Sequence, residues 1–415
     1  MTSDDPRLSR NTIPRRGTIS VVGGDGAVIR DAAGREWLDL SSQTVNLLFG
    51  QSHPFITERV IGQLRDYTFV DQDFDCPRDR MAIKRLRPLL PPNLTSFNIR
   101  MCNGSDAVEC AVKQARRATG RSRVLTVDGI YLGQTTQVIH FRGLGERPSD
   151  ILRGSTEDVL FAPTPYCDDH GHDPLECPTE NGELTAELIA RHHRELACVL
   201  VDPVLLSKGV FLGRAMSAFV TTVAAACREF GVPLVLDECQ SFGWVPGNTL
   251  STLWQVRPDA LVLAKGVAGG FPLSVCATTA ELDNLNWGEA DYTNGGHPVA
   301  VAAMDATCEL LADPAQQRDF GELCSVLDEH LPPATGTHAR SRGIGMVRAW
   351  EILSDGVPAD PAYVRHISDA CLDAGVYVRP YGSALGIKPP RSITADQLAK
   401  ALHTIGRVVD ETRGH

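Results

Sequence analysis

Two ionisable residues follow short apolar runs and could together do covalent chemistry. Lys265 follows the run Ala260-Leu-Val-Leu-Ala264, and Asp237 ends a similar run 28 residues earlier. A lysine amine can form a Schiff base with an aldehyde, and a buried carboxylate can keep a pyridine nitrogen protonated so that the ring accepts electrons from a carbanion. Pyridoxal 5'-phosphate requires both. Since the chain has only six lysines, the pair predicts an enzyme that uses this cofactor.

A second motif places small residues at the start of a predicted helix. Gly104 and Ser105 precede the segment 106–119, whose apolar residues recur at helical spacing. Free backbone N–H groups at a helix start attract an anion, and small side chains let it approach closely. Ser105 or Asp106 could instead simply cap the helix. In a chain that also carries Lys265 and Asp237, we interpret the motif as a phosphate-binding cup.

The elements that must position these residues alternate along the chain. Short apolar runs predict buried strands, and the segments between them have helical periodicity. The strands are expected at 123–127, 198–202, 233–237, 260–264 and 273–277, and helices at 106–119 and 216–230. This alternation predicts an α/β fold whose mostly parallel sheet is flanked by helices. The ligand of such a sheet lies at the carboxyl ends of its strands.

The flanking segments predict a smaller α+β domain built from both ends of the chain. Residues 18–40 resemble an antiparallel meander, and residues 343–350 are typical of a strand. The expected divisions are an N-terminal arm at 1–17, a large cofactor-binding domain at 56–311, and a small domain from 18–55 and 312–415.

Composition argues against several classes of partner. The net charge of -11 and the lack of a lysine-rich block argue against nucleic acid and anionic membranes. A polar N-terminus and the lack of a long apolar stretch predict a cytoplasmic protein. The twelve cysteines are irregularly spaced, which is typical of reduced core thiols. The cluster at 167–177 holds two Cys and two His but fits no standard zinc spacing, so we expect a surface loop and no metal site.

Six motifs in a fixed order resemble those of the class III aminotransferases, which are fold type I pyridoxal-phosphate enzymes. They are Asn103-Gly-Ser-Asp-Ala-Val-Glu109 with Ala115-Arg-Arg-Ala-Thr-Gly-Arg121, Tyr131-Leu-Gly133, Asp237-Glu-Cys-Gln240, Lys265-Gly-Val-Ala-Gly-Gly-Phe-Pro272 and Thr293-Asn-Gly-Gly-His-Pro298. The resemblance covers most of the chain, from Asp39 to Pro390. It implies a transferase that acts on a small-molecule amino substrate.

The resemblance implies a role for each matching residue around the cofactor ring. Lys265 corresponds to the Schiff-base lysine, whose freed amine also moves protons between the substrate and cofactor C4′. Asp237 corresponds to the carboxylate that faces the pyridine nitrogen. Gln240 corresponds to the residue near the phenolic oxygen, and Cys239 to the one that packs under the ring.

Further matches concern the phosphate and the second face of the ring. Gly104 and Ser105 correspond to the family's phosphate cup, and Tyr131 to the aromatic residue that stacks on an electron-poor ring. Thr293 corresponds to a residue that reaches the phosphate of the neighbouring subunit. The resemblance therefore implies a homodimer with two shared active sites.

The sequence departs from the family where substrate carboxylates bind. Many members have a glutamate that pairs with a late arginine, which grips a carboxylate when it is released. Ser207 stands at the glutamate position and Gly386 at the arginine position. A dicarboxylate such as 2-oxoglutarate would need another anchor, for which Arg379 and Lys208 are candidates.

Two further departures alter the predicted pocket. His297 replaces the usual asparagine, and Leu132 replaces a common histidine. The cofactor scaffold is thus retained while the residues around the substrate differ.

Three functions follow from these observations. The first is transamination between an amino donor and a carbonyl acceptor, in specialised metabolism. The second uses the same carbanion for epimerisation, decarboxylation, elimination or carbon–carbon bond formation, and the missing carboxylate pair favours it. The third is a silent cofactor-binding protein, against which the intact Lys265 and Asp237 argue.

Overall fold

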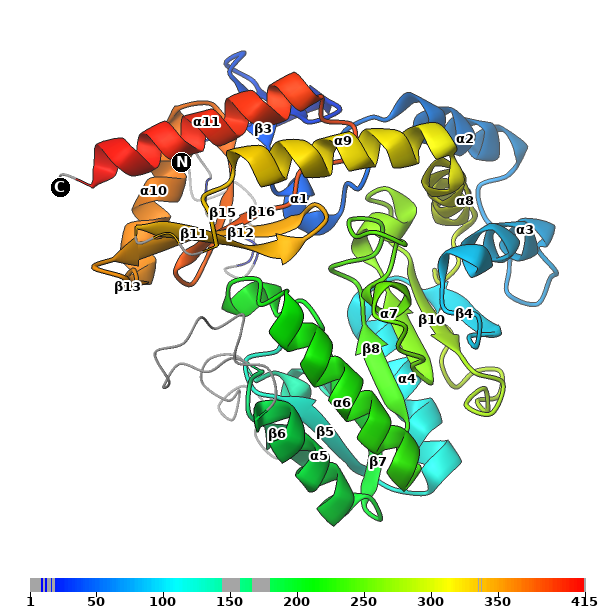
Figure 1. The fold of residues 1–415 in the computed structure, drawn as a ribbon. Coiled ribbons are helices and arrows are strands. Elements are labelled where there is room, and N and C mark those ends of the chain that lie inside the picture. The colour runs from blue at the N-terminus through cyan, green and yellow to red at the C-terminus, as the bar shows by residue number, and fades with distance from the viewer. Residues whose placement is uncertain are drawn as a thin grey trace.

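The computed structural model describes residues 9, 12, 16, 19–143, 157–165, 180–334, 336 and 338–413. Its large domain is built on a seven-stranded sheet with the order β4-β10-β9-β8-β7-β5-β6 (Figure 1). The strands are β4 (Ser96–Met101), β5 (Arg123–Val127), β6 (Val159–Ala162), β7 (Leu196–Val201), β8 (Leu234–Asp237), β9 (Ala260–Leu263) and β10 (Ser274–Thr278). Strands β7, β8 and β9 are buried along their whole length and, apart from Asp237 at the end of β8, apolar, as expected of strands covered on both faces.

The sheet is mostly parallel, which confirms the predicted fold class. Strands β6, β5, β7, β8 and β9 pair in parallel, whereas β10 runs antiparallel to both β4 and β9. The connection from β9 to β10 holds only a short 3-10 turn, η6 (Lys265–Ala268). A parallel crossover needs a connection of about a dozen residues or more, usually with a helix. The short connection therefore reverses the chain at Lys265.

Three long helices cover the central strands. They are α4 (Gly104–Thr119), α5 (Glu180–His192) and α6 (Arg214–Phe230). Helix α4 packs on β7, β9 and β10, and α5 packs on α6; Figure 1 shows α5 and α6 side by side in front of the strands. Helices α4 and α6 each end at a glycine in the left-handed region, Gly120 and Gly231, which closes the helix without steric cost. The predicted helices at 106–119 and 216–230 are confirmed within two residues of their starts.

Four more helices link the two parts of the chain. Helices α2 (Pro54–Asp66) and α3 (Pro77–Leu86) pack on the largely buried α8 (Pro298–Ala312), and α9 (Pro314–His330) continues from α8. All four begin with a proline, which has no N–H to leave unpaired there. The short segments are α1 (Ser42–Val45), α7 (Leu250–Leu253), η2 (Arg87–Leu89), η3 (Val138–Phe141) and η5 (Leu206–Lys208).

Two further sheets bring the ends of the chain together. The first has the order β1 (Val21–Asp25), β2 (Val28–Asp31), β3 (Glu36–Asp39) and β14 (Val376–Tyr377). Its first three strands are antiparallel, which confirms the predicted meander. Strand β14 adds to β3 in parallel, so the N-terminal and C-terminal segments share one sheet.

The second of these sheets corrects one expectation. Its order is β11 (Ala339–Ile344), β12 (Val347–Ser354), β16 (Ala384–Ile387) and β15 (Arg379–Tyr381), with β13 (Val357–Pro358) beside β12. The prediction of one strand at 343–350 is wrong, because β11 and β12 form an antiparallel hairpin that turns at Gly345. The φ of Gly345 is 59°, which breaks the extended run. Helices α10 (Pro361–Asp373) and α11 (Ala395–Thr412) complete this part of the fold above the large sheet in Figure 1.

The segment 167–177 lies entirely outside the described residues, as does most of the arm at 1–17. Within the described part of the chain, no group of His, Cys, Asp or Glu residues could hold a metal ion, and no helix is long and apolar enough to cross a membrane. The cysteines that the structure describes are all free. The domain boundaries stay a prediction.

Candidate active site

A cavity of about 420 Å³ lies beside the carboxyl ends of β8 and β9 and the start of α4. Its wall includes six of the residues predicted from the sequence: Gly104, Ser105, Tyr131, Asp237, Cys239 and Lys265. Two predicted residues, Gln240 and Thr293, do not line this cavity. The switch from strand to loop after β8 and β9 brings Asp237 and Lys265 to the same edge of the sheet.

The N-terminus of α4 has the properties of an anion cup. The helix follows its N-cap residue Asn103, and the Asp106 carboxylate accepts a hydrogen bond from the Asn103 N–H at 2.9 Å as one half of a capping box. The N–H groups of Gly104 and Ser105 begin the helix and have no intrahelical acceptor. A Cβ atom on Gly104 would lie 3.3 Å from the Cys239 Sγ, within the cradle itself. A phosphate fits this position because its oxygens would accept from the free N–H groups.

Asp237 is buried at the end of β8. The residue is only 5% exposed, and its Oδ1 accepts a hydrogen bond from the Cys239 N–H at 3.0 Å. Burial raises the pKa of the Asp237 carboxyl, and the charge of nearby Lys265 partly lowers it again. A buried carboxylate gains from a cationic partner, which a protonated pyridine nitrogen supplies. The residue therefore suits the role that the resemblance implies.

Lys265 occupies a constrained turn at the floor of the cavity. Its φ is 52°, in the left-handed region that residues other than glycine seldom adopt. The next residue, Gly266, packs under the Trp244 ring, and a Cβ there would lie 2.7 Å from the indole Cζ3. Such strain persists only where the surrounding structure enforces it. Trp244 and Gly266 thus hold the direction in which Lys265 leaves the backbone.

Tyr131 forms another part of the wall, with a cation behind it. The Arg142 guanidinium lies 5.4 Å from the centre of the Tyr131 ring. The ring is available to stack on a flat electron-poor group in the cavity. Gly133 sits close to the same wall, where a Cβ would lie 2.2 Å from the Ser105 Oγ. Gly133 belongs to the Tyr131-Leu-Gly133 motif, and its close approach to Ser105 is a role that the sequence did not predict.

Gln240 lies behind the cavity in a buried polar network. Its Nε2 donates to the Asp202 Oδ2 at 3.4 Å, and the Val204 N–H donates to the Asp202 Oδ1 at 2.8 Å. Burial, and next the charge of Asp237, raises the pKa of the Asp202 carboxyl to about 7. Asp202 was not among the site residues predicted from the sequence. Its place directly after β7 was the available signal.

Asn46 also lines the cavity and was missed. It follows α1, far from the other wall residues in sequence, and only the fold brings it there. No local motif surrounds it.

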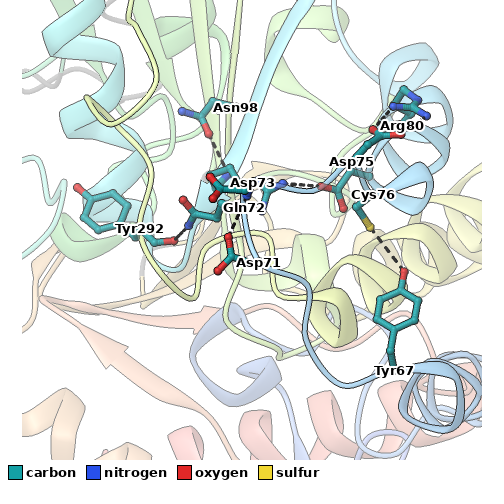
Figure 2. Close-up of polar contacts among 11 residues, drawn as sticks. Tyr67, Asp71, Gln72, Asp73, Asp75, Cys76, Arg80, Asn98 and Tyr292 are labelled. Carbon is teal, nitrogen blue, oxygen red and sulfur yellow. Dashed lines mark hydrogen bonds and ion pairs between the residues drawn. The ribbon is translucent and has the colours of Figure 1, made fainter.

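Thr293 lies on an exposed turn before α8. Figure 2 shows the neighbouring loop between α2 and α3, from which the Gln72 Nε2 donates to the Tyr292 carbonyl oxygen at 2.5 Å. Two large apolar side chains of this region are exposed, Phe74 at 68% and Trp287 at 76%. Thr293 is therefore open to solvent and not part of the wall of the chain's own cavity.

The structure explains one departure from the family in physical terms. A Cβ on Gly386 would lie 2.7 Å from the Cδ2 and Cε2 atoms of the Tyr381 ring. The ring of Tyr381 thus covers the position where the family has its arginine. Burial raises the pKa of the Tyr381 phenol, and it therefore stays neutral.

The alternative cations near this corner are engaged or turned outward. The Arg379 Nη1 donates to the Thr44 Oγ1 at 2.5 Å, and its guanidinium lies 5.7 Å from the Tyr381 ring centre. The side chain of Lys208 is exposed and packs along Gly129. Of the other two departures, Leu132 lines the cavity, whereas the His297 Nδ1 accepts from the Val299 N–H at 3.3 Å.

Comparison with known proteins identifies the family. The sequence profile described as aminotransferase class-III matches residues 12–409. This chain belongs to the class III aminotransferases. The predicted family, fold class, enzyme class and cofactor are confirmed, and this aminotransferase is a pyridoxal-phosphate-dependent transferase.

Individual relatives of this aminotransferase have diverse activities. It is 30% identical over 419 residues to the adenosylmethionine-8-amino-7-oxononanoate aminotransferase of Synechococcus elongatus, with 95% of each chain covered. It is 25% identical to the alanine/serine racemase of Pyrococcus horikoshii, over 94% of this chain and 85% of the racemase. An aminotransferase crystal structure from Vibrio fluvialis, in its PMP-bound form, has a TM-score of 0.85 at 21% identity, covering 99% and 96% of the two chains. This last likeness shows the fold alone.

Proposed function

We propose that this aminotransferase moves an amino group from a donor to a carbonyl acceptor by means of Lys265, without the family's glutamate–arginine carboxylate pair. Pyridoxal phosphate, when bound, supplies an aldehyde that condenses with amines and a ring that withdraws electrons from the reacting carbon. The amine of Lys265 holds the cofactor and then carries the proton between the substrate carbon and C4′.

The other residues of the wall orient the cofactor in this proposal. Asp237 keeps the pyridine nitrogen protonated, and the N–H groups of Gly104 and Ser105 hold the phosphate. Tyr131 and Cys239 enclose the ring from its two faces, and this excludes water from the reacting carbon. Gln240 donates toward the phenolic oxygen from its place beside Asp202.

The contact between Tyr381 and Gly386 is the observation that supports a substrate without a carboxylate at this end. An aromatic ring at this position offers apolar contact and no charge, so a carboxylate placed there would lose water without gaining a partner. Ser207 likewise brings no charge. We infer an acceptor or donor whose far end is neutral, and we propose a role in specialised metabolism.

The variant Lys265→Ala tests the role of the lysine. We expect loss of the cofactor's absorbance as a lysine adduct and loss of amino transfer, whereas Lys400→Ala, an exposed lysine on α11, leaves both unchanged. Turnover by Lys265→Ala at the wild-type rate would show that the assignment is wrong.

A second candidate function keeps the amino group on the substrate, for instance in epimerisation. The similarity to the alanine/serine racemase favours it. Adding amino donors to the purified enzyme separates the two. Conversion of the cofactor to stable pyridoxamine phosphate supports transamination, and inversion of a chiral amino donor without that conversion supports the second function.

We also propose a cytoplasmic homodimer in which Thr293 of each subunit reaches the phosphate in the other. The exposed position of Thr293 and the exposed Phe74 and Trp287 near it support this arrangement. The free cysteines support a reducing compartment. Sedimentation of the purified protein measures the assembly, and Trp287→Glu should shift it toward the monomer.

A further inference from the structure

Lys388 is a buried lysine whose amine points toward the cofactor site. The residue is 2% exposed, and its Nζ donates to the carbonyl oxygen of Gln240. The same Nζ lies 5.2 Å from the centre of the Trp244 ring. Trp244 in turn packs on Gly266, directly after Lys265. The amine therefore contacts the segment 237–240 directly and the Lys265 segment only through the Trp244 ring.

The backbone around Lys388 anchors it from a third side. Its N–H donates to the Leu40 carbonyl at 2.7 Å, and its own carbonyl accepts from the Ser42 hydroxyl at 2.7 Å. The next residue, Pro389, accepts from the Trp244 indole N–H at 3.0 Å. These bonds fix the backbone at Lys388 and therefore the point from which its side chain extends toward the Gln240 carbonyl.

Burying the Lys388 amine costs desolvation free energy. Burial lowers the pKa of the Lys388 amine well below its usual value; Lys265 adds to this effect, and Asp202 opposes it. A methionine would fill the same volume without an amine to desolvate. The presence of a lysine here is therefore explained by the hydrogen bond from its amine to the Gln240 carbonyl. The charges near the amine are those of Asp202 and Lys265.

We propose that Lys388 is a positioning residue of the cofactor site, whose amine holds the Gln240 carbonyl so that the Gln240 amide stays beside Asp202 beneath the cofactor. Gln240 lies in the loop that follows Asp237, and the bond from Trp244 to Pro389 holds the same loop to the end of β16 at a second point. Lys388 couples that loop to the strand that carries Gly386. This inference rests on the proposed roles of Lys265 and Gln240.

The experiment compares Lys388→Met with wild type and with Lys400→Met as the matched control on the exposed face of α11. Each protein is reconstituted with pyridoxal phosphate, and the absorbance of the bound cofactor is titrated against pH. We expect Lys388→Met to raise the pH midpoint, because a displaced Gln240 amide no longer donates to the phenolic oxygen and the lysine adduct then keeps its proton to higher pH. Its affinity for pyridoxal phosphate should fall about tenfold through the loosened Gln240 loop.

A residue that only fills the core would lower the melting temperature of the protein with and without cofactor and leave the pH midpoint unchanged. An unchanged midpoint in Lys388→Met overturns the proposal. If this variant does not fold, Lys388→Leu decides on the same midpoint, since it also lacks a donor to the Gln240 carbonyl. Lys265→Ala distinguishes failure of the Lys388 proposal from failure of the proposed function. If this variant keeps the lysine-adduct absorbance, the proposed function itself is wrong.

Discussion

Restoring an arginine at position 386 tests whether packing against Tyr381 removed the family's carboxylate site. In Gly386→Arg alone, the new Cβ would lie 2.7 Å from two ring atoms of Tyr381. Such overpacking typically costs about 1–3 kcal/mol. We therefore expect this single variant to melt at a lower temperature than wild type and to gain no activity toward dicarboxylates.

The double variant Gly386→Arg/Tyr381→Ala removes the collision and leaves room for the guanidinium. A hydrogen bond to a charged group contributes about 1.5–3 kcal/mol, so kcat/KM for a dicarboxylate acceptor should rise by about 10–150-fold. The assay compares kcat/KM for 2-oxoglutarate with that for a neutral aldehyde, using one amino donor. Tyr381→Ala alone controls for the enlarged space.

Two results would refute this reasoning. The first is a wild-type enzyme for which 2-oxoglutarate and glutamate are already the best pair, because a carboxylate anchor must then exist elsewhere. The second is a double variant that changes kcat/KM for both acceptors by the same factor.

Three further predictions concern the cofactor cup and the buried charges. Gly104→Val places methyl groups beside Cys239, and its affinity for pyridoxal phosphate should fall at least about tenfold in a fluorescence titration, with Gly104→Ala intermediate. Glu351→Gln breaks the buried ion pair with Arg342 (2.7 Å between Nη1 and Oε2) and should destabilise the fold by about 3–5 kcal/mol in denaturant unfolding. The pKa of Asp202 is raised to about 7, so between its ordinary pKa and 7 the unfolded chain releases a proton that the folded state keeps, and stability falls as pH rises through this window. Asp202→Asn should abolish this slope of the melting temperature; an unchanged slope would contradict the assignment.

Local sequence was sufficient to predict the strands and helices of the large domain. The apolar runs before Asp237 and Lys265 have no other way to bury their side chains than in a covered sheet, and both end where a strand ends. Prediction failed where a single residue turned the chain. Gly345 divides the expected strand at 343–350 into a hairpin, because a positive φ interrupts pairing within an otherwise apolar run.

For the site, the order and types of residues determined the cofactor, since Lys265, Asp237 and the cup at Gly104 each have a local motif. The tertiary structure decided which other groups meet them. Asn46 reaches the cavity from the N-terminal segment, and Lys388 reaches Gln240 across 148 residues of chain. Contacts between residues so distant in sequence depend on how whole strands pack, and no local pattern encodes that packing.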